Sequence, residues 1–114
     1  MLVNGEQAIG LVYDLLFEKK WLVEKAEKLP LDPLSEKEAV MFLATLDQQS
    51  ETTWLQLTPN QRSTANGLIM DFIAKCLTTS REWNVPDDLS PPEQAIHIFK
   101  QEIERSHFSL LILN

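Results

Sequence analysis

Glycine is scarce in this chain of 114 residues, which contains only Gly5, Gly10 and Gly67. Loops that cradle phosphate groups need several glycines at fixed spacing, because backbone N–H groups must approach the phosphate oxygens closely. The glycines of this chain do not have such a spacing. The standard nucleotide-binding motifs are therefore excluded, and we expect no cofactor.

Cysteine is almost absent, since Cys76 is the only one. A single cysteine cannot form an internal disulfide, and Cys76 lies within an apolar helical pattern. We therefore predict a small buried hydrophobic side chain rather than a nucleophile. The chain also lacks a secretory signal and any apolar run near the ~18 residues that a membrane-spanning helix requires. These features predict a soluble protein of a reducing compartment, the cytoplasm.

Basic residues are outnumbered, because 10 Lys and Arg stand against 17 Asp and Glu and give a net charge of −7. The deficit is greatest between residues 29 and 61, where Lys37 is the only basic residue. An acidic surface repels phosphate backbones and anionic lipid headgroups, so we expect neither direct nucleic-acid binding nor membrane binding. The acidic 29–61 surface is instead a candidate docking face for a basic protein partner.

Catalytic and metal-binding arrangements are also missing from the pattern. Glu93 and His97 have the spacing of a helical chelating pair, but His107 falls on roughly the opposite side of the same helix. A stable metal site needs three or four ligands that face one another. The adjacent carboxylates Asp87 and Asp88 lie in a polar loop, where nothing predicts the desolvation that acid–base catalysis requires. We therefore predict no metal site, no catalytic residues and no enzymatic activity.

The most regular pattern in the chain runs from residue 58 to residue 77. Apolar residues recur there at alternating spacings of three and four, which predicts one stripe along a helix, formed by Ala65, Leu68, Ile69, Phe72, Ile73, Cys76 and Leu77. Thr58 is placed as the N-cap, Pro59 fits the first turn, and Gln61 can complete a capping box. A stripe this wide needs cover from several other helices.

Three further helices are predicted from their caps and their apolar periodicity. The first begins after Asn4 and runs for about 24 residues. Gly10 weakens this helix by about 1 kcal/mol relative to alanine, which either a close helix crossing or a functional role would explain. The second helix begins at a capping box formed by Ser35 and Glu38. The last helix begins after Ser90, and its inner face carries Ala95, Ile98, Phe99 and Ile103.

The connections between these helices complete the expected fold. Residues 50–57 predict a short helical turn capped by Ser50, and Trp83 and Val85 are placed to pin the loop 81–89 onto the core. Loops of about six to eleven residues are longer than those of an idealised up-down bundle. The sequence therefore predicts an all-α fold, an irregular bundle of four main helices plus one short helical turn with no substantial sheet. We expect residues 1–114 to form a single helical domain.

The last residues of the chain are unusual because they are apolar. Residues 108–114 form a tail or an extension of the last helix, with large apolar side chains at Phe108, Leu110, Leu111, Ile112 and Leu113. Chain ends are usually polar and frayed, and an exposed segment of this composition promotes aggregation. We therefore expect this segment to be buried, either in the core of the domain or in an interface with a second copy or another protein.

These observations favour a role in protein–protein interaction, assembly or regulation, without catalysis, in which the apolar residues between 108 and 113 bind the partner. Self-association as a homodimer is one form of this hypothesis. Two alternatives stay open. Trp21, Trp54, Trp83 and Tyr13 can line a small-molecule pocket between helices, and an acidic surface can mimic nucleic acid and inhibit a DNA-binding protein. No motif in the sequence identifies a partner.

Overall fold

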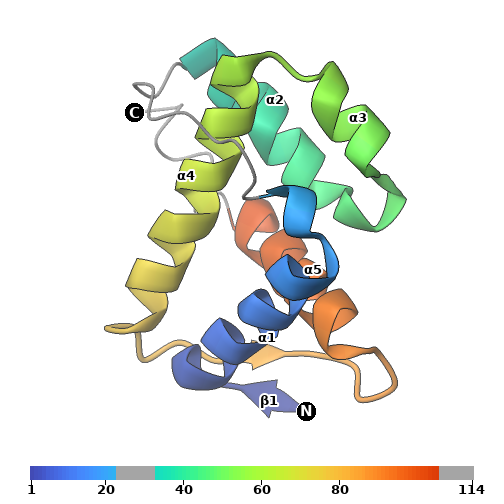
Figure 1. Cartoon of the computed structure of the whole chain (residues 1–114). Coiled ribbons are helices and arrows are strands. Elements are labelled where there is room, and N and C mark those ends of the chain that lie inside the picture. Colours follow the sequence, from blue (N-terminus) through green and yellow to red (C-terminus); the bar gives the residue numbers. More distant parts are fainter. Residues whose placement is uncertain (23–32, 106–114) are drawn as a thin grey trace.

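A computed structural model describes residues 1–22 and 33–105 of the chain (Figure 1). These residues contain five α-helices: α1 (Gly5–Glu18), α2 (Pro33–Ala44), α3 (Glu51–Gln56), α4 (Pro59–Cys76) and α5 (Pro91–Glu104). They also contain the short 3₁₀ helices η1 (Lys20–Leu22) and η2 (Leu46–Gln48) and the strands β1 (Leu2–Val3) and β2 (Trp83–Asn84). The prediction of an all-α bundle with four main helices and one short helical element, here α3, is confirmed.

The helices pack around α1 and α4. Helix α1 contacts α5 on one side and α4 on another, and α2 contacts both α4 and α5. Figure 1 shows α4 along one flank of the molecule, α2 and α3 together at one end, and β1 with the N-terminus at the other end. Because each helix has a neighbour on at least one side, one apolar core runs through the bundle.

Aromatic side chains form two groups within this core. Trp54 lies 5.6 Å from Phe42 and 5.7 Å from Trp21, measured between ring centroids. Phe72 lies 5.7 Å from Trp83 and 5.4 Å from Phe99. Offset and edge-on arrangements at these separations are the favourable geometries for aromatic pairs. The first group joins η1, α2 and α3, and the second joins α4, β2 and α5.

Hydrogen-bonded caps begin several of the helices as the sequence predicted. Asn4 and Gln7 form a reciprocal capping box at α1, and Thr58 and Gln61 form another at α4. Ser50 caps α3, which confirms the short helix expected there. Helix α5 begins at Pro91 as expected, but the Ser90 hydroxyl donates to the carboxylate of Glu93 at 2.8 Å and does not cap the backbone.

The predicted start of the second helix was wrong. Helix α2 begins at Pro33, so Ser35 lies inside the first turn and is buried there rather than standing at the N-cap position. Proline suits the first turn of a helix because its fixed φ is already helical and its missing N–H has no partner to lose. That preference places the start of the helix two positions before the serine.

The first helix is shorter than predicted. It ends at Glu18, and Lys19 departs from helical geometry with φ −109° and ψ 67° before η1 begins. This break turns Leu22 fully into the core and brings Trp21 against Phe42 and Trp54. Burial of these large side chains therefore outweighs the helical periodicity at the break. The rest of the predicted helix falls on residues 23–32, outside the described part of the chain.

A close crossing does involve a glycine of α1, but the glycine is not the one predicted. A Cβ atom at Gly5 would collide with the carbonyl oxygen of Cys76 and lie 3.1 Å from the Thr79 methyl group, so Gly5 permits the contact between α1 and α4. A Cβ atom at Gly10 would meet nothing within 4 Å. The expectation that a helix crossing explains Gly10 is wrong.

The loop before α5 is pinned to the core as predicted. Trp83 and Val85 are almost completely buried. The backbone of this loop also pairs with the N-terminal residues in an antiparallel two-stranded sheet, in which Val3 faces Trp83 and Leu2 faces Asn84. The sequence pattern did not predict this pairing, because strands of two residues are too short to show an alternation.

No helix within residues 1–22 and 33–105 has both the length and the apolar character that crossing a lipid bilayer demands.

Candidate functional site

Helix α1 leaves large apolar side chains uncovered on one side. Tyr13 is 58% exposed and Phe17 is 75% exposed, and their four-residue spacing places them one above the other on the helix. Ile9 and Leu16 border them and are partly and mostly buried, respectively. An aromatic side chain as exposed as Phe17 gains nothing from burial within the described chain, so it is available to a partner.

Helix α4 presents a second apolar stripe. Met70 is 44% exposed and Leu77, the residue just after the helix, is 74% exposed. Ile73 lies between them and packs partly against the core. The offsets of three and four residues place the three side chains on one side of the helix. The prediction that Leu77 belongs to the buried stripe is therefore wrong, although Cys76 beside it is buried as predicted.

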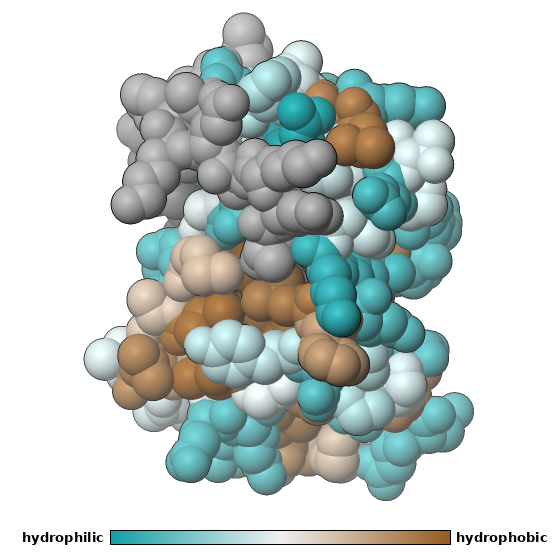
Figure 2. Space-filling view, viewed as in Figure 1, coloured by the Kyte–Doolittle hydropathy of each residue, from teal (hydrophilic) through white to brown (hydrophobic). Residues whose placement is uncertain are grey.

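The two stripes meet because α1 and α4 run side by side in opposite directions. Gly5 at the start of α1 touches the end of α4 at Cys76, and the Asn66 side chain in α4 donates a hydrogen bond to the carbonyl of Leu22 beyond the end of α1. Figure 2 shows hydrophobic residues gathered over α1 and the C-terminal half of α4. We call this surface the α1–α4 face, formed by Ile9, Tyr13, Leu16, Phe17, Met70, Ile73 and Leu77.

Charged residues on α1 and just after it border this face. Glu6 and Asp14 are exposed on the helix, and Lys20 follows its end. The Lys20 ammonium lies 4.9 Å from the centre of the Phe17 ring, within the range of a cation–π contact. Glu18 is also exposed in the last turn of α1, which has no basic residue, so the helix itself is acidic along this border and Lys20 lies beyond it.

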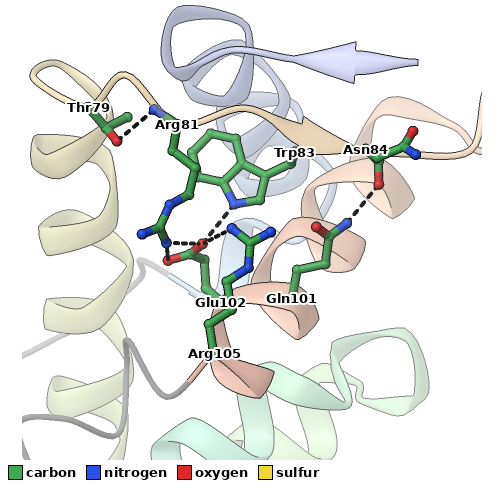
Figure 3. Close-up of polar contacts among 7 residues, drawn as sticks. All are labelled: Thr79, Arg81, Trp83, Asn84, Gln101, Glu102 and Arg105. Carbon is green, nitrogen blue, oxygen red and sulfur yellow. Dashed lines mark hydrogen bonds and ion pairs between the residues drawn. The ribbon is translucent and has the colours of Figure 1, made fainter.

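A second candidate site is a polar network between β2 and α5 (Figure 3). The Glu102 carboxylate, buried to 8% exposure, accepts hydrogen bonds from Arg81 at 2.9 and 3.1 Å and from the Trp83 indole N–H at 2.8 Å. Arg105 adds an ion pair at 4.0 Å, and the Gln101 side chain donates to the Asn84 carbonyl at 2.8 Å. Every oxygen of Glu102 has a partner, so this network joins the loop to the helix rather than leaving a reactive group free.

A cleft of about 260 Å³ lies beside this network. Its lining consists of Phe72, Lys75, Cys76, Thr78, Thr79, Arg81, Trp83 and Glu102. Burial, with the Glu102 charge as a smaller cause, raises the pKa of the Cys76 thiol to about 11, so the thiol is protonated at neutral pH. A protonated thiol is a poor nucleophile. The cleft is also smaller than the roughly 300–1,000 Å³ of most small-molecule sites.

One buried carboxylate lacks a complete set of partners. Glu36, in the first turn of α2, is only 3% exposed, and its Oε1 atom has no hydrogen-bond partner among the described residues. Burial raises the pKa of this carboxyl group above its ordinary value of 4.5. Burial stabilises the protonated form of Glu36 relative to that of an exposed carboxyl group, because the neutral form loses less on leaving water.

The residues singled out in the sequence are only partly brought together. Phe108, Leu110, Leu111, Ile112 and Leu113, the predicted partner-binding residues, lie outside the described residues, as does His107. Within the candidate acidic docking face, Glu36 is buried and Asp47 forms an ion pair with Lys100 at 3.3 Å, so neither presents a free carboxylate.

The three tryptophans do not share one cavity. Trp21 and Trp54 pack against each other, and only Trp83 borders the cleft. In the described part of the chain, His, Cys, Asp and Glu side chains do not gather in groups of three or more that could hold a metal ion.

Comparison with protein-family models, curated proteins and solved structures gave no significant match to this chain.

Proposed function

We propose that this chain is a helical protein-interaction module without catalytic activity, and that it binds a protein through the α1–α4 face. The observation that carries the proposal is the convergence of Tyr13 and Phe17 on α1 with Met70 and Leu77 on α4, all exposed. Aromatic residues and methionine are enriched at the centres of protein interfaces, where they remove large apolar areas from water.

The charge of the molecule narrows the class of partner. A net charge of −7 opposes binding to phosphate backbones and to anionic membranes. The α1–α4 face is a helical surface rather than an enclosed cavity, which suits a protein better than a small molecule. The cleft beside Trp83 supports the small-molecule alternative less well, because its charged groups already pair with neighbours in the chain.

The absence of catalysis is part of the same proposal. It is supported by a Cys76 thiol that stays protonated at neutral pH and by a Glu102 carboxylate whose oxygens are occupied by Arg81 and Trp83. The apolar segment between residues 108 and 113 stays a predicted second contact with the partner, based on its sequence.

A pull-down from a lysate of the native host tests the proposal. The wild-type chain is compared with Phe17→Asp, and with Leu55→Asp as a matched control on α3, where Leu55 is 62% exposed and outside the α1–α4 face. Each partner is then purified, and its affinity for the three chains is measured by titration calorimetry.

We expect Phe17→Asp to weaken binding at least about tenfold, because a charge replaces an apolar anchor, and Leu55→Asp to leave it unchanged. Equal affinity of all three chains for every partner would overturn the role of the α1–α4 face. A chain that lacks residues 108–114 measures the separate contribution of that segment.

A further inference from the structure

Two rows of residues with a four-residue spacing run side by side along α1. The apolar row contains Ile9, Tyr13 and Phe17. The second row, here called the acidic row, contains Glu6, Gly10, Asp14 and Glu18, and its three carboxylates are exposed. Residues four apart lie above one another on a helix, so the acidic row follows the apolar row along its whole length. The α1–α4 face therefore has a negatively charged border on α1.

The charges of the acidic row have no ionic partners within the described chain. Glu6, Asp14 and Glu18 form no ion pair with any other described residue. Lys19 and Lys20 lie beyond the end of α1, and their ammonium groups lie over aromatic rings instead. The border therefore keeps three uncompensated negative charges beside an exposed apolar surface.

Gly10 opens a gap in the acidic row. It is exposed, and a Cβ atom there would meet nothing within 4 Å among the described residues. Glu6 and Asp14 lie four residues before and after it, about 6 Å away along the helix axis, and Tyr13 lies three residues after it. Lysine and arginine side chains fit these surroundings, because their apolar stems pack on exposed backbone while their charged ends reach a carboxylate or an aromatic ring.

The form of the occupant follows from the backbone of the face. Both helices that build the face satisfy their backbone hydrogen-bonding groups internally, so an extended segment would find no strand edge to pair with. A helix satisfies its own backbone and can lay an apolar stripe over two neighbouring helices. The apolar row from Ile9 to Phe17 spans about 12 Å of the α1 axis, which about two turns of such a helix cover.

We infer that the α1–α4 face binds a basic amphipathic helix of another protein. The apolar side of that helix covers Tyr13 and Phe17, and its lysine or arginine side chains contact the acidic row, one of them in the gap at Gly10. The inference rests on the proposed function and states the chemistry of its partner. A second copy of the chain fits the face less well, because it brings the same acidic row and a net charge of −7, whereas a basic helix is attracted.

Two synthetic peptides of about 18 residues test the inference on the full chain. One peptide has leucine on one side of a helix and lysine on the other, and the second peptide has glutamate in place of lysine. We expect the leucine–lysine peptide to bind at least about tenfold more tightly in titration calorimetry, because like charges across an interface reduce affinity. Equal affinities, or binding of neither peptide, would overturn the inference.

Neutral substitutions show which carboxylates attract the peptide. One variant combines Glu6→Gln, Asp14→Asn and Glu18→Gln, and its matched control combines Glu51→Gln, Glu82→Gln and Glu104→Gln at exposed positions outside the face. Both variants lose three negative charges. We expect the first to bind the leucine–lysine peptide at least about fivefold more weakly than the wild type and the control to differ from the wild type by less than about twofold. An equal loss in both would mean that net charge alone attracts the peptide, which would also overturn the inference.

Two further variants test the apolar contact and the gap. Phe17→Asn removes the ring without adding a charge that would attract lysine, and Leu55→Asn is its control. Gly10→Gln fills the gap with a neutral side chain that favours the helix. We expect Phe17→Asn and Gly10→Gln each to weaken binding of the leucine–lysine peptide several-fold while circular dichroism shows an unchanged fold. Wild-type affinity in Gly10→Gln would overturn the placement of a basic side chain in the gap.

The outcomes separate this inference from the proposed function. If Phe17→Asn weakens the binding of a captured protein while neutralisation of the acidic row does not, the face binds a protein that is not basic, and only the inference fails. If Phe17→Asn weakens the binding of neither the peptide nor any captured protein, the proposed function fails as well. A chain that sediments as a dimer in ultracentrifugation, and as a monomer in Phe17→Asn, would identify a second copy as the occupant and overturn the inference.

Discussion

Glu36 and Glu102 are both buried carboxylates, but their surroundings differ in how far they compensate the negative charge. Glu102 receives donors from Arg81 and Trp83, so its charge is compensated where it lies. Glu36 keeps an Oε1 atom without a partner among the described residues, and its burial is uncompensated there. An unpaired buried polar group costs free energy, whereas a fully paired one fixes the elements that it joins.

The substitution Glu36→Gln is expected to raise the free energy of unfolding at neutral pH by about 1 kcal/mol, because it removes a desolvated charge and keeps the shape of the side chain. The raised pKa of Glu36 means that the folded state binds its proton more tightly than the unfolded state. The Glu36 contribution is therefore most favourable below the ordinary value of 4.5 and is lost as pH rises through the folded pKa.

Urea unfolding of both chains at a series of pH values measures this effect. The gain from Glu36→Gln should shrink as the pH falls from neutrality toward the folded pKa of Glu36, since the wild-type group then becomes neutral as well. A variant that is less stable than the wild type at neutral pH would show that the charge of Glu36 has a partner that stabilises it.

The substitution Glu102→Gln is expected to lower the free energy of unfolding by about 1–2 kcal/mol, because the amide loses the ion pair with Arg81 but can still accept from Trp83. The expected loss of free energy of unfolding is small because Arg81 is about one third exposed, and water therefore screens the pair. Glu104→Gln, an exposed position on the same helix, is the control and should change stability by less than about 0.5 kcal/mol. Equal urea midpoints for the two variants would contradict this role of Glu102.

At the scale of single elements, the sequence predicted most helices well and two of their ends badly. The caps at Asn4, Ser50 and Thr58 were predictable because capping depends on residues within one turn of each other. The end of α1 at Glu18 was not predictable in this way. The end of α1 depends on the burial of Leu22 in η1, and the residues that pack against η1 lie far along the chain.

The two glycines of α1 give a matched test of local packing. Gly10→Ala is expected to raise the free energy of unfolding of the monomer by up to about 1 kcal/mol, because alanine favours the helix and nothing within 4 Å opposes its methyl group. Gly5→Ala should instead be destabilising by more than about 1 kcal/mol, since its Cβ would collide with the backbone of Cys76.

Thermal unfolding of the two variants measures both signs. Equal melting temperatures for the two variants would contradict the difference in surroundings between Gly5 and Gly10.

At the scale of the whole molecule, the sequence predicted the fold class but not the α1–α4 face. The exposure of Tyr13 and Phe17 depends on which sides of α1 are covered by α4 and α5, and periodicity within one helix does not reveal its neighbours. Leu77 matched the apolar stripe of α4 by spacing alone. Leu77 keeps helical dihedral angles, and its spacing from Met70 places it on the exposed border of the helix rather than on the core side.

The strand β1 and the helix α1 have partners that are synthesised much later. Val3 pairs with Trp83, and α1 packs on α5, so residues near the start of the chain are completed by residues beyond position 80. A ribosome therefore releases α1 with its inner side uncovered and holds it in that state until α5 has emerged. Contacts between such distant residues slow folding, so we expect the apolar inner side of α1 to be open to aggregation during this interval.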